Sequence, residues 1–546
     1  MKALIFQPLL LTLPLSSVAV EHRRRCSYGD SCWPTESEWI AFNSSISGRL
    51  IRTYPSAAVC HTERYDDAQC AVAKENWSNS FWRTNQTGAY TAILWELGEK
   101  DQCFIDSPRA APCDQGIVPH YSVSVNSVND VQAAVKFASK KDLYLVVKNT
   151  GHDHLGRSSG KGAFAIWTHN LKGKEWHTAF IPKQAPRETA GVAGVTLQAG
   201  EQWLEVFADV YKAAAEQGVI VVGGSARTVG AAGGYLTGGG HSPFAHFYGL
   251  AVDNLLEVNL VDANGEARTI NQYTDPDYFY ALRGGGGSAW GVITSVTYKT
   301  HPNPSHIQAG FVQFNVTNNS TLRTVLKKTL QELPNITDAG YTGYGIMNFL
   351  PDGGEPVGFA AIFIQPNRTN ATFAKTFGPY YDIAKIPGVS GLVANVEFPS
   401  WIEYAKVFVQ DPNIATNIID ASRLLTSQVL LHRTDDLLDL MFDYPTHAPG
   451  FDFSEHFKGH MAAYSPPDAN IFLPLVGKVN SAERDNTAAH SIWKQSRALM
   501  SFGANWKDDA PADEKRRGKL DLVEISKRLG QIVGPDGGTY LNEANP

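Results

Sequence analysis

Two glycine-rich segments, each close behind a short apolar run, constrain this chain more than any other feature. The first, residues 148–160, follows the run 143–147, and the second, 230–240, comes after the run 219–222. Glycines leave backbone N–H groups bare at strand ends, where an anion can be held without intruding side chains. Such loops suit a pyrophosphate, and the first also carries His152. The two segments therefore predict a dinucleotide cradle with a histidine built into it.

Residues 121–147 lead into the first segment as strand, helix and strand. A strand is predicted at 121–125, Ser127 is placed as the cap of a helix through 131–138, and the apolar run 143–147 predicts a second strand. The segment that follows lacks the fingerprint of nicotinamide-binding proteins. That fingerprint is a Gly-x-Gly-x-x-Gly motif at the start of a helix, followed about 20 positions later by an acidic residue. An α/β start is predicted, and a Rossmann dehydrogenase is disfavoured.

Length and composition bound the remaining possibilities. The 546 residues suggest about two to four domains, and 43% apolar with 18% charged residues is a globular composition. A net charge of −7 leaves no basic field for nucleic acid. No stretch after the N-terminus reaches the roughly 18 uninterrupted apolar residues of a membrane span. We expect neither a nucleic-acid nor a membrane partner, and a monomer by default.

The N-terminal end has the layout of a secretory signal peptide. Lys2 precedes an apolar run over residues 3–15, and small residues at 17–19 resemble a cleavage site, so residues 1–19 are expected to be removed. Three disulfides are expected in segment 20–114, and the sequence cannot choose among the many pairings. The six cysteines, all in the first quarter, are Cys26, Cys32, Cys60, Cys70, Cys103 and Cys113. A secreted, extracellular protein is predicted.

The cysteine spacing and the glycosylation sequons add two further expectations. No metal site is expected, because the cysteines form no Cys-x-x-Cys motif. Nine Asn-x-Ser/Thr sequons fit a glycoprotein. They lie at Asn43, Asn76, Asn85, Asn315, Asn318, Asn319, Asn335, Asn367 and Asn370.

The rest of the chain predicts further strands and helices. Before residue 302 we expect a helix over 203–217, a strand over 256–261 with a hairpin turn at 263–266, and a strand over 291–298. After residue 302 the pattern changes to long strands alternating with helices. This change predicts a second domain, in which no catalytic cluster is recognisable. Its strands are expected at 307–316, 358–365 and 470–479, and its helices at 322–333 and 417–442.

Four stretches together carry a family resemblance: residues 148–160, 228–242, 248–254 and 277–287. In this order and spacing they resemble the secreted fungal branch of flavin-linked oxidases similar to berberine bridge enzyme and vanillyl-alcohol oxidase, over essentially all of residues 30–546. The resemblance implies an α+β fold. A bipartite PCMH-type FAD-binding domain of two α/β subdomains is implied at 115–302, a substrate domain of antiparallel sheet covered by helices at 303–510, and a C-terminal return to the FAD domain at 511–546.

The resemblance also implies FAD as cofactor, with its pyrophosphate in the first segment. His152 aligns with the histidine that many members join covalently to the 8α-methyl group. Some relatives add a second tether from a cysteine two residues before the matching Thr-Val-Gly, where this chain has Ala226, so at most one covalent bond is expected. The FAD-binding residues implied are Lys148, Asn149, Thr150, Gly151, His152, Asp153, Ser158, Thr228, Gly230, Gly233, Gly234, Leu236, Gly239, Gly240, His241, Asp253, Val292 and Asn542.

The chemistry implied is transfer of a hydride from a substrate C–H to flavin N5, with O2 reoxidising the flavin to give H2O2. Residues 540–543 resemble the family segment Tyr-x-Asn-Tyr, whose second tyrosine often acts as the base. Glu543 stands in its place, and a carboxylate desolvated beside a flavin can serve as a base. Glu543 and Tyr540 are the catalytic candidates, with His241 and Tyr235 as alternative site residues.

The chain departs from the family at its end. It stops at Pro546, whereas relatives usually continue with an aromatic-rich strand and a helix that close the flavin domain. The return at 511–546 is therefore expected to be truncated.

The substrate class stays open at this level. Aromatic residues of the second domain, such as Trp401, Tyr404, Tyr464 and Trp493, can stack a sugar as well as an aromatic alkaloid or polyketide. A small-molecule secondary metabolite is expected ahead of a carbohydrate. A dehydrogenase with an acceptor other than O2, and an inactive relative that only binds flavin or a ligand, are the alternatives.

Overall fold

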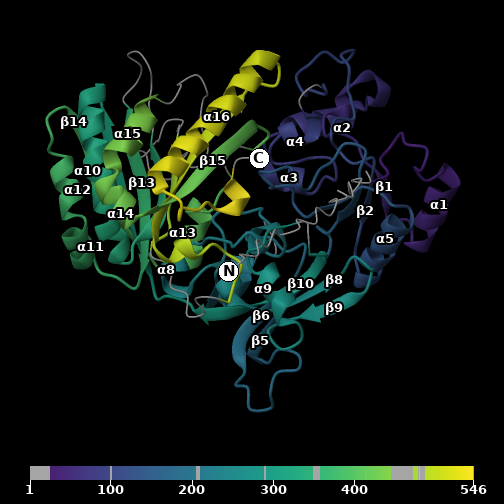
Figure 1. The fold of residues 1–546 in the computed structure, drawn as a ribbon, viewed down its shortest axis with the longest axis horizontal. Coiled ribbons are helices and arrows are strands. Elements are labelled where there is room, and N and C mark those ends of the chain that lie inside the picture. The colour runs from purple at the N-terminus through teal and green to yellow at the C-terminus, as the bar shows by residue number, and fades with distance from the viewer. Residues whose placement is uncertain are drawn as a thin grey trace, which may run out of the picture.

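The computed structural model describes residues 25–544 except 99–100, 205–209, 288–289, 348–356, 412–413, 444–470, 478 and 480–485. The expected signal peptide and Tyr464 lie outside these residues. Three sheets and the helices around them organise the chain (Figure 1). The α+β fold class expected from the sequence is thereby confirmed.

The N-terminal segment is made of short helices tied by disulfides. Its helices are α1 (Glu36–Ser45), α2 (Asp67–Glu75), α3 (Ser80–Thr84) and α4 (Leu94–Leu97). Each cysteine pairs with the next one along the chain, in the bridges Cys26–Cys32, Cys60–Cys70 and Cys103–Cys113. The sequence had left this pairing open, and the structure selects the three most local bridges.

The first glycine-rich segment follows a strand of a small four-stranded sheet. The sheet has the order β1 (Leu50–Arg52), β2 (Tyr121–Ser124), β4 (Phe164–Trp167) and β3 (Leu145–Lys148), and β4 is parallel to both of its neighbours. Ser127 caps α5 (Val128–Lys140) through the N–H of Asp130, as predicted. The segment therefore starts at the carboxyl end of β3, where open α/β sheets bind their ligands.

A second sheet carries the other glycine-rich segment. Its strands, all paired antiparallel, are β5 (Lys174–Phe180), β6 (Val192–Gln198), β10 (Val292–Pro302), β8 (Leu255–Val261) and β9 (Ala267–Ile270), with β7 (Val219–Val221) beside the end of β10. The segment follows β7 and includes the short helix α7 (Gly234–Thr237).

The helix expected over 203–217 is found in its second half. The described part, α6, runs only from Val210 to Glu216. Trp203 is not helical, because its N–H reaches back to the carbonyl of Val229 while Gln202 forms an isolated β-bridge with Gly230. Contact with the second glycine-rich segment therefore holds Trp203 outside the helix; residues 205–209 are not among those described.

The third sheet has seven antiparallel strands. In order they are β14 (Val389–Phe398), β11 (Ile307–Val316), β13 (Val357–Pro366), β12 (Thr342–Met347), β16 (Ile471–Leu475), β17 (Ser496–Trp506) and β15 (Asn417–Thr426). Helices cover one of its faces in Figure 1, among them α10 (Asn319–Asp338), α14 (Ser427–His432), α15 (Thr434–Asp443) and α16 (Ala512–Val533). None of the described helices has the length and apolar character to cross a membrane.

The helix expected over 417–442 is wrong in its first part. Residues 417–426 form strand β15, which pairs with β17 along its whole length and lies under α16. Eight of its ten residues are buried, so the strand shows no alternation of apolar and polar residues. A strand buried on both faces lacks the two-residue period by which a strand is recognised in a sequence, and tertiary pairing decided here.

Candidate active site

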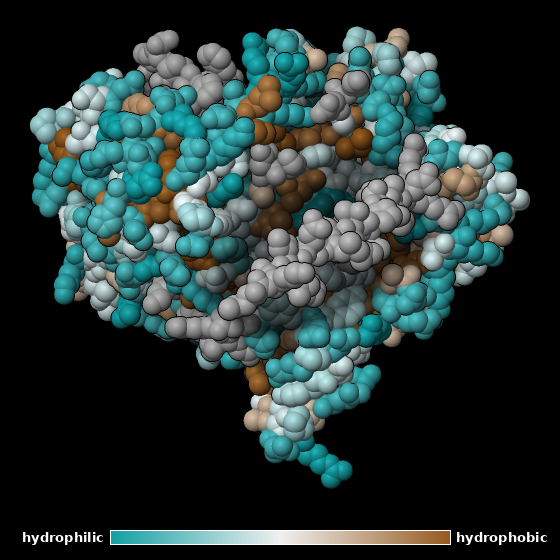
Figure 2. Space-filling model, in the orientation of Figure 1, coloured by the Kyte–Doolittle hydropathy of each residue, from teal (hydrophilic) through white to brown (hydrophobic). Residues whose placement is uncertain are grey.

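A cavity of about 780 Å³ lies where the three sheets meet. Its lining includes residues of β3, β10 and β12, together with both glycine-rich segments. The volume falls within the roughly 300–1,000 Å³ of small-molecule and cofactor sites. Figure 2 shows hydrophobic side chains deep between two largely hydrophilic sides of the molecule. The cavity exists only because separate parts of the chain come together.

Asn149 connects the two glycine-rich segments. Its Nδ2 donates to the carbonyl of Ala199 at 2.6 Å and to that of Ala232 at 2.8 Å. Its Oδ1 is buried and has no hydrogen-bond partner among the described residues. Because buried polar atoms are nearly always paired, this unsatisfied acceptor indicates a ligand donor at that point of the cavity wall.

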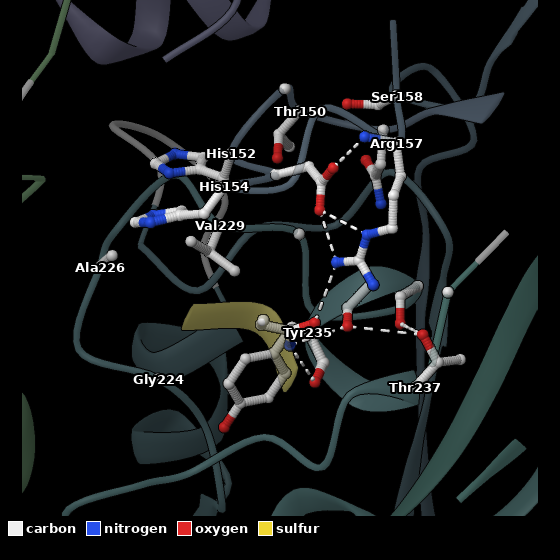
Figure 3. Close-up of a pocket in the computed structure, with 18 of the residues that line it drawn as sticks. Thr150, His152, His154, Arg157, Ser158, Gly224, Ala226, Val229, Tyr235 and Thr237 are labelled. Atoms are coloured by element: carbon white, nitrogen blue, oxygen red, sulfur yellow. Dashed lines mark hydrogen bonds and ion pairs between the residues drawn. The ribbon is translucent and has the colours of Figure 1, made fainter. Parts of the chain in front are cut away.

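Arg157 and Asn542 add a polar network across the cavity (Figure 3). Arg157 Nε donates to Asp153 Oδ1 at 2.8 Å, and one of its terminal nitrogens donates to Asn542 Oδ1 at 3.1 Å. Of these residues, Figure 3 labels Arg157. Asn542 Nδ2 in turn donates to the carbonyl of Gly234 at 3.0 Å. The C-terminal segment is thus joined to both glycine-rich segments.

His152 contacts a threonine of the second segment. Its Nε2 lies 2.7 Å from Thr228 Oγ1, and the Thr228 hydroxyl donates to Asp411 Oδ2 at 2.8 Å. Burial lowers the pKa of His152 to about 4, although Asp411 opposes the shift. The imidazole is therefore neutral at neutral pH and lies at the cavity wall.

His154 points to the same side of the cavity as His152 in Figure 3, but its charge differs. Its Nδ1 lies 3.4 Å from Oδ1 of Asp420, a buried residue of β15. Burial alone would lower the pKa of His154, but Asp420, with smaller contributions from Glu543 and Asp153, raises it to about 9. Two neighbouring histidines of one loop are thus held in opposite protonation states.

The C-terminal segment brings Glu543 to the cavity. Glu543 Oε1 lies 3.1 Å from His241 Nε2, and Oε2 is buried without a hydrogen-bond partner among the described residues. Ser422 of β15 donates its hydroxyl to the Glu543 carbonyl at 2.6 Å, which fixes the segment. Tyr540 is buried, and burial raises its pKa, so its phenol stays neutral. Glu543 therefore offers a free carboxylate oxygen to a ligand.

The structure brings most of the expected site residues together and leaves six away from the cavity surface. The fourteen that line it are Asn149, Thr150, Gly151, His152, Asp153, Ser158, Gly230, Gly233, Gly234, His241, Val292, Tyr540, Asn542 and Glu543. Lys148, Thr228, Leu236, Gly239, Gly240 and Asp253 are not among the lining residues. Lys148 donates to the carbonyl of Gln86 at 2.6 Å, and Asp253 accepts the N–H of Leu250 at 2.8 Å.

The far wall of the cavity is one face of the seven-stranded sheet. Every second residue of its strands faces inward, as the two-residue period of a strand requires. These residues are Tyr344 and Ile346 of β12, Ala360 and Ile362 of β13, Ile418 and Asp420 of β15, and Phe472 of β16. Tyr404 and Phe408 of α13 (Trp401–Phe408) also line the cavity. This wall is mainly apolar and aromatic.

Sequence reasoning missed two acidic residues from the part of the chain after residue 302. Asp411 follows α13 and Asp420 lies within β15, so neither belongs to a local motif. No local signal marked Asp420, because its strand also carries the polar residues Ser422 and Arg423. Arg157 lies within the first glycine-rich segment, but its contact with Asn542 depends on the fold.

The residues present fit FAD. A Cβ added at Gly234 would meet no heavy atom within 4 Å, so the second segment leaves open space beside its backbone. Gly151 and Gly233 have φ angles of +91° and +124°, which glycine adopts freely and which turn the backbone around the cavity. The bare backbone of the two segments suits a phosphate centre, and the unsatisfied acceptor Asn149 Oδ1 suits a hydroxyl or N–H donor elsewhere on the same long ligand.

Comparison with known proteins agrees with this geometry. Residues 119–271 match the FAD binding domain family. The chain is 61% identical to an uncharacterized FAD-linked oxidoreductase of Arthroderma benhamiae, over 99% of this chain and 91% of the relative. The VAO-type flavoprotein MtVAO615 from Myceliophthora thermophila C1 has a TM-score of 0.81 at 26% identity, covering 95% of this chain and 90% of that one.

The similarity in fold extends to a more distant relative in sequence. Berberine bridge enzyme from Eschscholzia californica superposes with a TM-score of 0.55 at 17% identity, covering 78% of each chain. At this identity the match concerns the fold alone.

Proposed function

The chain belongs to the FAD-linked oxidoreductases of the vanillyl-alcohol oxidase and berberine bridge enzyme type, and from this premise we propose that it is a secreted oxidase of a small apolar molecule. FAD, when bound, supplies the acceptor for a substrate hydride, and O2 takes the two electrons to become H2O2. The observation that carries the proposal is that His152 and Glu543 line one cavity, together with an aromatic wall. The three disulfides support a secreted protein.

His152 is proposed to form the covalent link to FAD. Its position at the cavity wall, within the first glycine-rich segment, supports this assignment. Ala226 lines the same cavity and has no thiol, so a single link is proposed.

Glu543 is proposed to remove the substrate proton. Its Oε2 is unpaired and free to accept, while His241 holds Oε1 at 3.1 Å and orients the carboxylate. The neutral Tyr540 is better suited to fixing the wall, because its oxygen accepts from Asn542 at 2.8 Å. The base is thus the residue that replaces the second tyrosine of the family segment.

The wall favours an apolar, ring-bearing substrate over a sugar. Ile346, Ile362, Ile418 and Phe472 offer no hydrogen bonds to the many hydroxyls of a carbohydrate. Burying such hydroxyls without partners would cost binding free energy at each unpaired group. A secondary metabolite with an aromatic or polyketide framework is therefore the proposed substrate class, ahead of a carbohydrate.

The test is the visible spectrum of the purified secreted protein before and after acid precipitation, followed by a substrate panel with H2O2 as readout. A yellow pellet from the wild type and from His432→Ala, but not from His152→Ala, is expected; His432 is exposed and serves as the matched control. Flavin reduction without H2O2 would indicate a dehydrogenase instead. A protein that binds no flavin contradicts the proposal and favours a relative that binds another ligand.

A further inference from the structure

His152 belongs to a chain of hydrogen bonds that ends on a carboxylate of the second domain. Thr228 gives both its N–H and its hydroxyl to Asp411, at 3.1 Å to Oδ1 and 2.8 Å to Oδ2. The Asp411 side chain is 2% exposed, and its Oδ1 lies 3.9 Å from His152 Nε2. The imidazole, the hydroxyl and the carboxylate come from three separate segments of the chain.

The direction of these hydrogen bonds fixes the protonation of the imidazole. A carboxylate only accepts, so the proton between Thr228 and Asp411 comes from the threonine hydroxyl. That hydroxyl has no second proton, and its oxygen must accept from Nε2–H of His152 at 2.7 Å. His152 thus carries its proton on Nε2, and Nδ1 bears the lone pair.

Nδ1 is left free by this arrangement. It makes no hydrogen bond to any residue in the described part of the chain, and His152 lines the cavity. A free lone pair on a neutral imidazole is a nucleophile, whereas a protonated nitrogen is not.

We propose that Thr228 and Asp411 are positioning residues for covalent flavin attachment: they hold His152 with its proton on Nε2, so that Nδ1 is the atom that bonds to the 8α carbon of FAD. This inference rests on the proposed function, because it assumes that FAD occupies the cavity. It assigns a role to Asp411, which no sequence motif had marked.

The atoms and electrons of the step balance with O2 as oxidant. Nδ1 forms a bond to the 8α carbon, which loses one proton, and the electron pair of the broken C–H bond passes to the flavin ring. The attack leaves a positive charge on the imidazole until Nε2 releases its proton. O2 takes the two electrons with these two protons and becomes H2O2.

Asp411 acts on the charged stage of this step. An imidazolium forms in a buried site, where an isolated charge is strongly disfavoured. The Asp411 carboxylate, 3.9 Å from Nε2, stabilises that charge. It also accepts the hydrogen bond from the Thr228 hydroxyl, which strengthens as the imidazole becomes charged. The network therefore selects the attacking nitrogen and also lowers the barrier to attack.

The experiment compares Thr228→Val, Thr228→Ser and Asp411→Asn with the wild type. Valine keeps the shape of threonine without the hydroxyl, and serine keeps the hydroxyl. The fraction of FAD in the acid-precipitated pellet is followed over time in each purified, FAD-loaded protein, and non-covalent FAD is measured in the supernatant. NMR of the isolated flavin peptide identifies the bonded ring nitrogen.

We expect Thr228→Val and Asp411→Asn to bind FAD but to attach it about 10- to 100-fold more slowly, by analogy with the loss when the hydrogen-bond partner of a metal-bound histidine is removed. Thr228→Ser is expected to retain the wild-type rate, which shows that the hydroxyl and not the fold is responsible. Equal rates in wild type and Thr228→Val, or a bond through Nε2, would overturn the inference and leave the proposed function intact. A wild type without acid-stable flavin would overturn the covalent link itself.

Discussion

Gly230 lies so close to Asn149 that no side chain fits between them. A Cβ at Gly230 would fall 2.5 Å from Asn149 Nδ2, the atom that donates to the carbonyls of Ala199 and Ala232. The glycine therefore permits the contact that joins the two glycine-rich segments. Its role here is close approach, because its φ is not in the positive region.

Gly230→Ala is expected to destabilise the protein by about 1–3 kcal/mol, because the new methyl group must displace the Asn149 amide from its two acceptors. Gly234→Ala is the matched control, since a Cβ there meets nothing within 4 Å. Thermal unfolding of the FAD-free proteins provides the measurement. Equal melting temperatures for the two variants would show that Asn149 shifts at no cost.

Glu543→Gln is expected to slow flavin reduction by about 10²- to 10⁴-fold, because the amide keeps the shape of the side chain but cannot take a proton. FAD content should not change, since the segment is held by Asn542 and by the Glu543 carbonyl. Anaerobic stopped-flow absorbance measures the rate once a substrate is known. Glu524→Gln, an exposed position on α16, controls for the loss of a surface charge. An unchanged rate in Glu543→Gln would assign the base to another residue.

His154 should stabilise the folded protein in a limited pH range. Asp420 raises its folded-state pKa to about 9 against an ordinary value near 6.5. The folded state then binds the proton more tightly, so the stabilisation is complete below about pH 6.5 and is lost as the pH rises through 9. His154→Gln should therefore lose most stability at neutral pH and little at about pH 10.

Denaturant unfolding of wild type and His154→Gln at a series of pH values tests this expectation. His432→Gln, an exposed histidine on α14, is the control and should follow the wild type throughout. A stability difference that does not vary with pH would show that His154 is not charged by Asp420.

Lys148 should make the stability of the folded protein rise with pH, whereas the contribution of His154 falls with pH. Burial lowers its folded-state pKa to about 7, against 10.5 in the ordinary case. Between these values the unfolded chain binds the extra proton, so the free energy of unfolding rises with pH across that window. In Lys148→Met this rise should be reduced, as measured by urea unfolding from about pH 7 to pH 10. The same slope in both proteins would contradict the assignment.

Much of residues 119–271, which match the FAD binding domain family, could be predicted from local sequence. The cap at Ser127, the strand before His152 and the hairpin after 261 depend on short-range rules, and the structure has them. The helix expected over 417–442 failed over 417–426, because a strand with eight of its ten residues buried shows no two-residue period. Its partner β17 lies 70 or more residues away, beyond the reach of any local pattern.

The sequence by itself determined the cradle: which residues are glycine, where His152 stands between them, and that the family segment ends on Glu543 instead of tyrosine. These are properties of composition and order along one stretch of chain. Only the tertiary structure decided which groups face each other. Asp411 meets Thr228 and His152, and Asp420 meets His154, because a distant sheet packs against the glycine-rich segments. Charge and hydrogen bonding act over a few ångströms of space, so residues far apart in sequence set the protonation of both histidines.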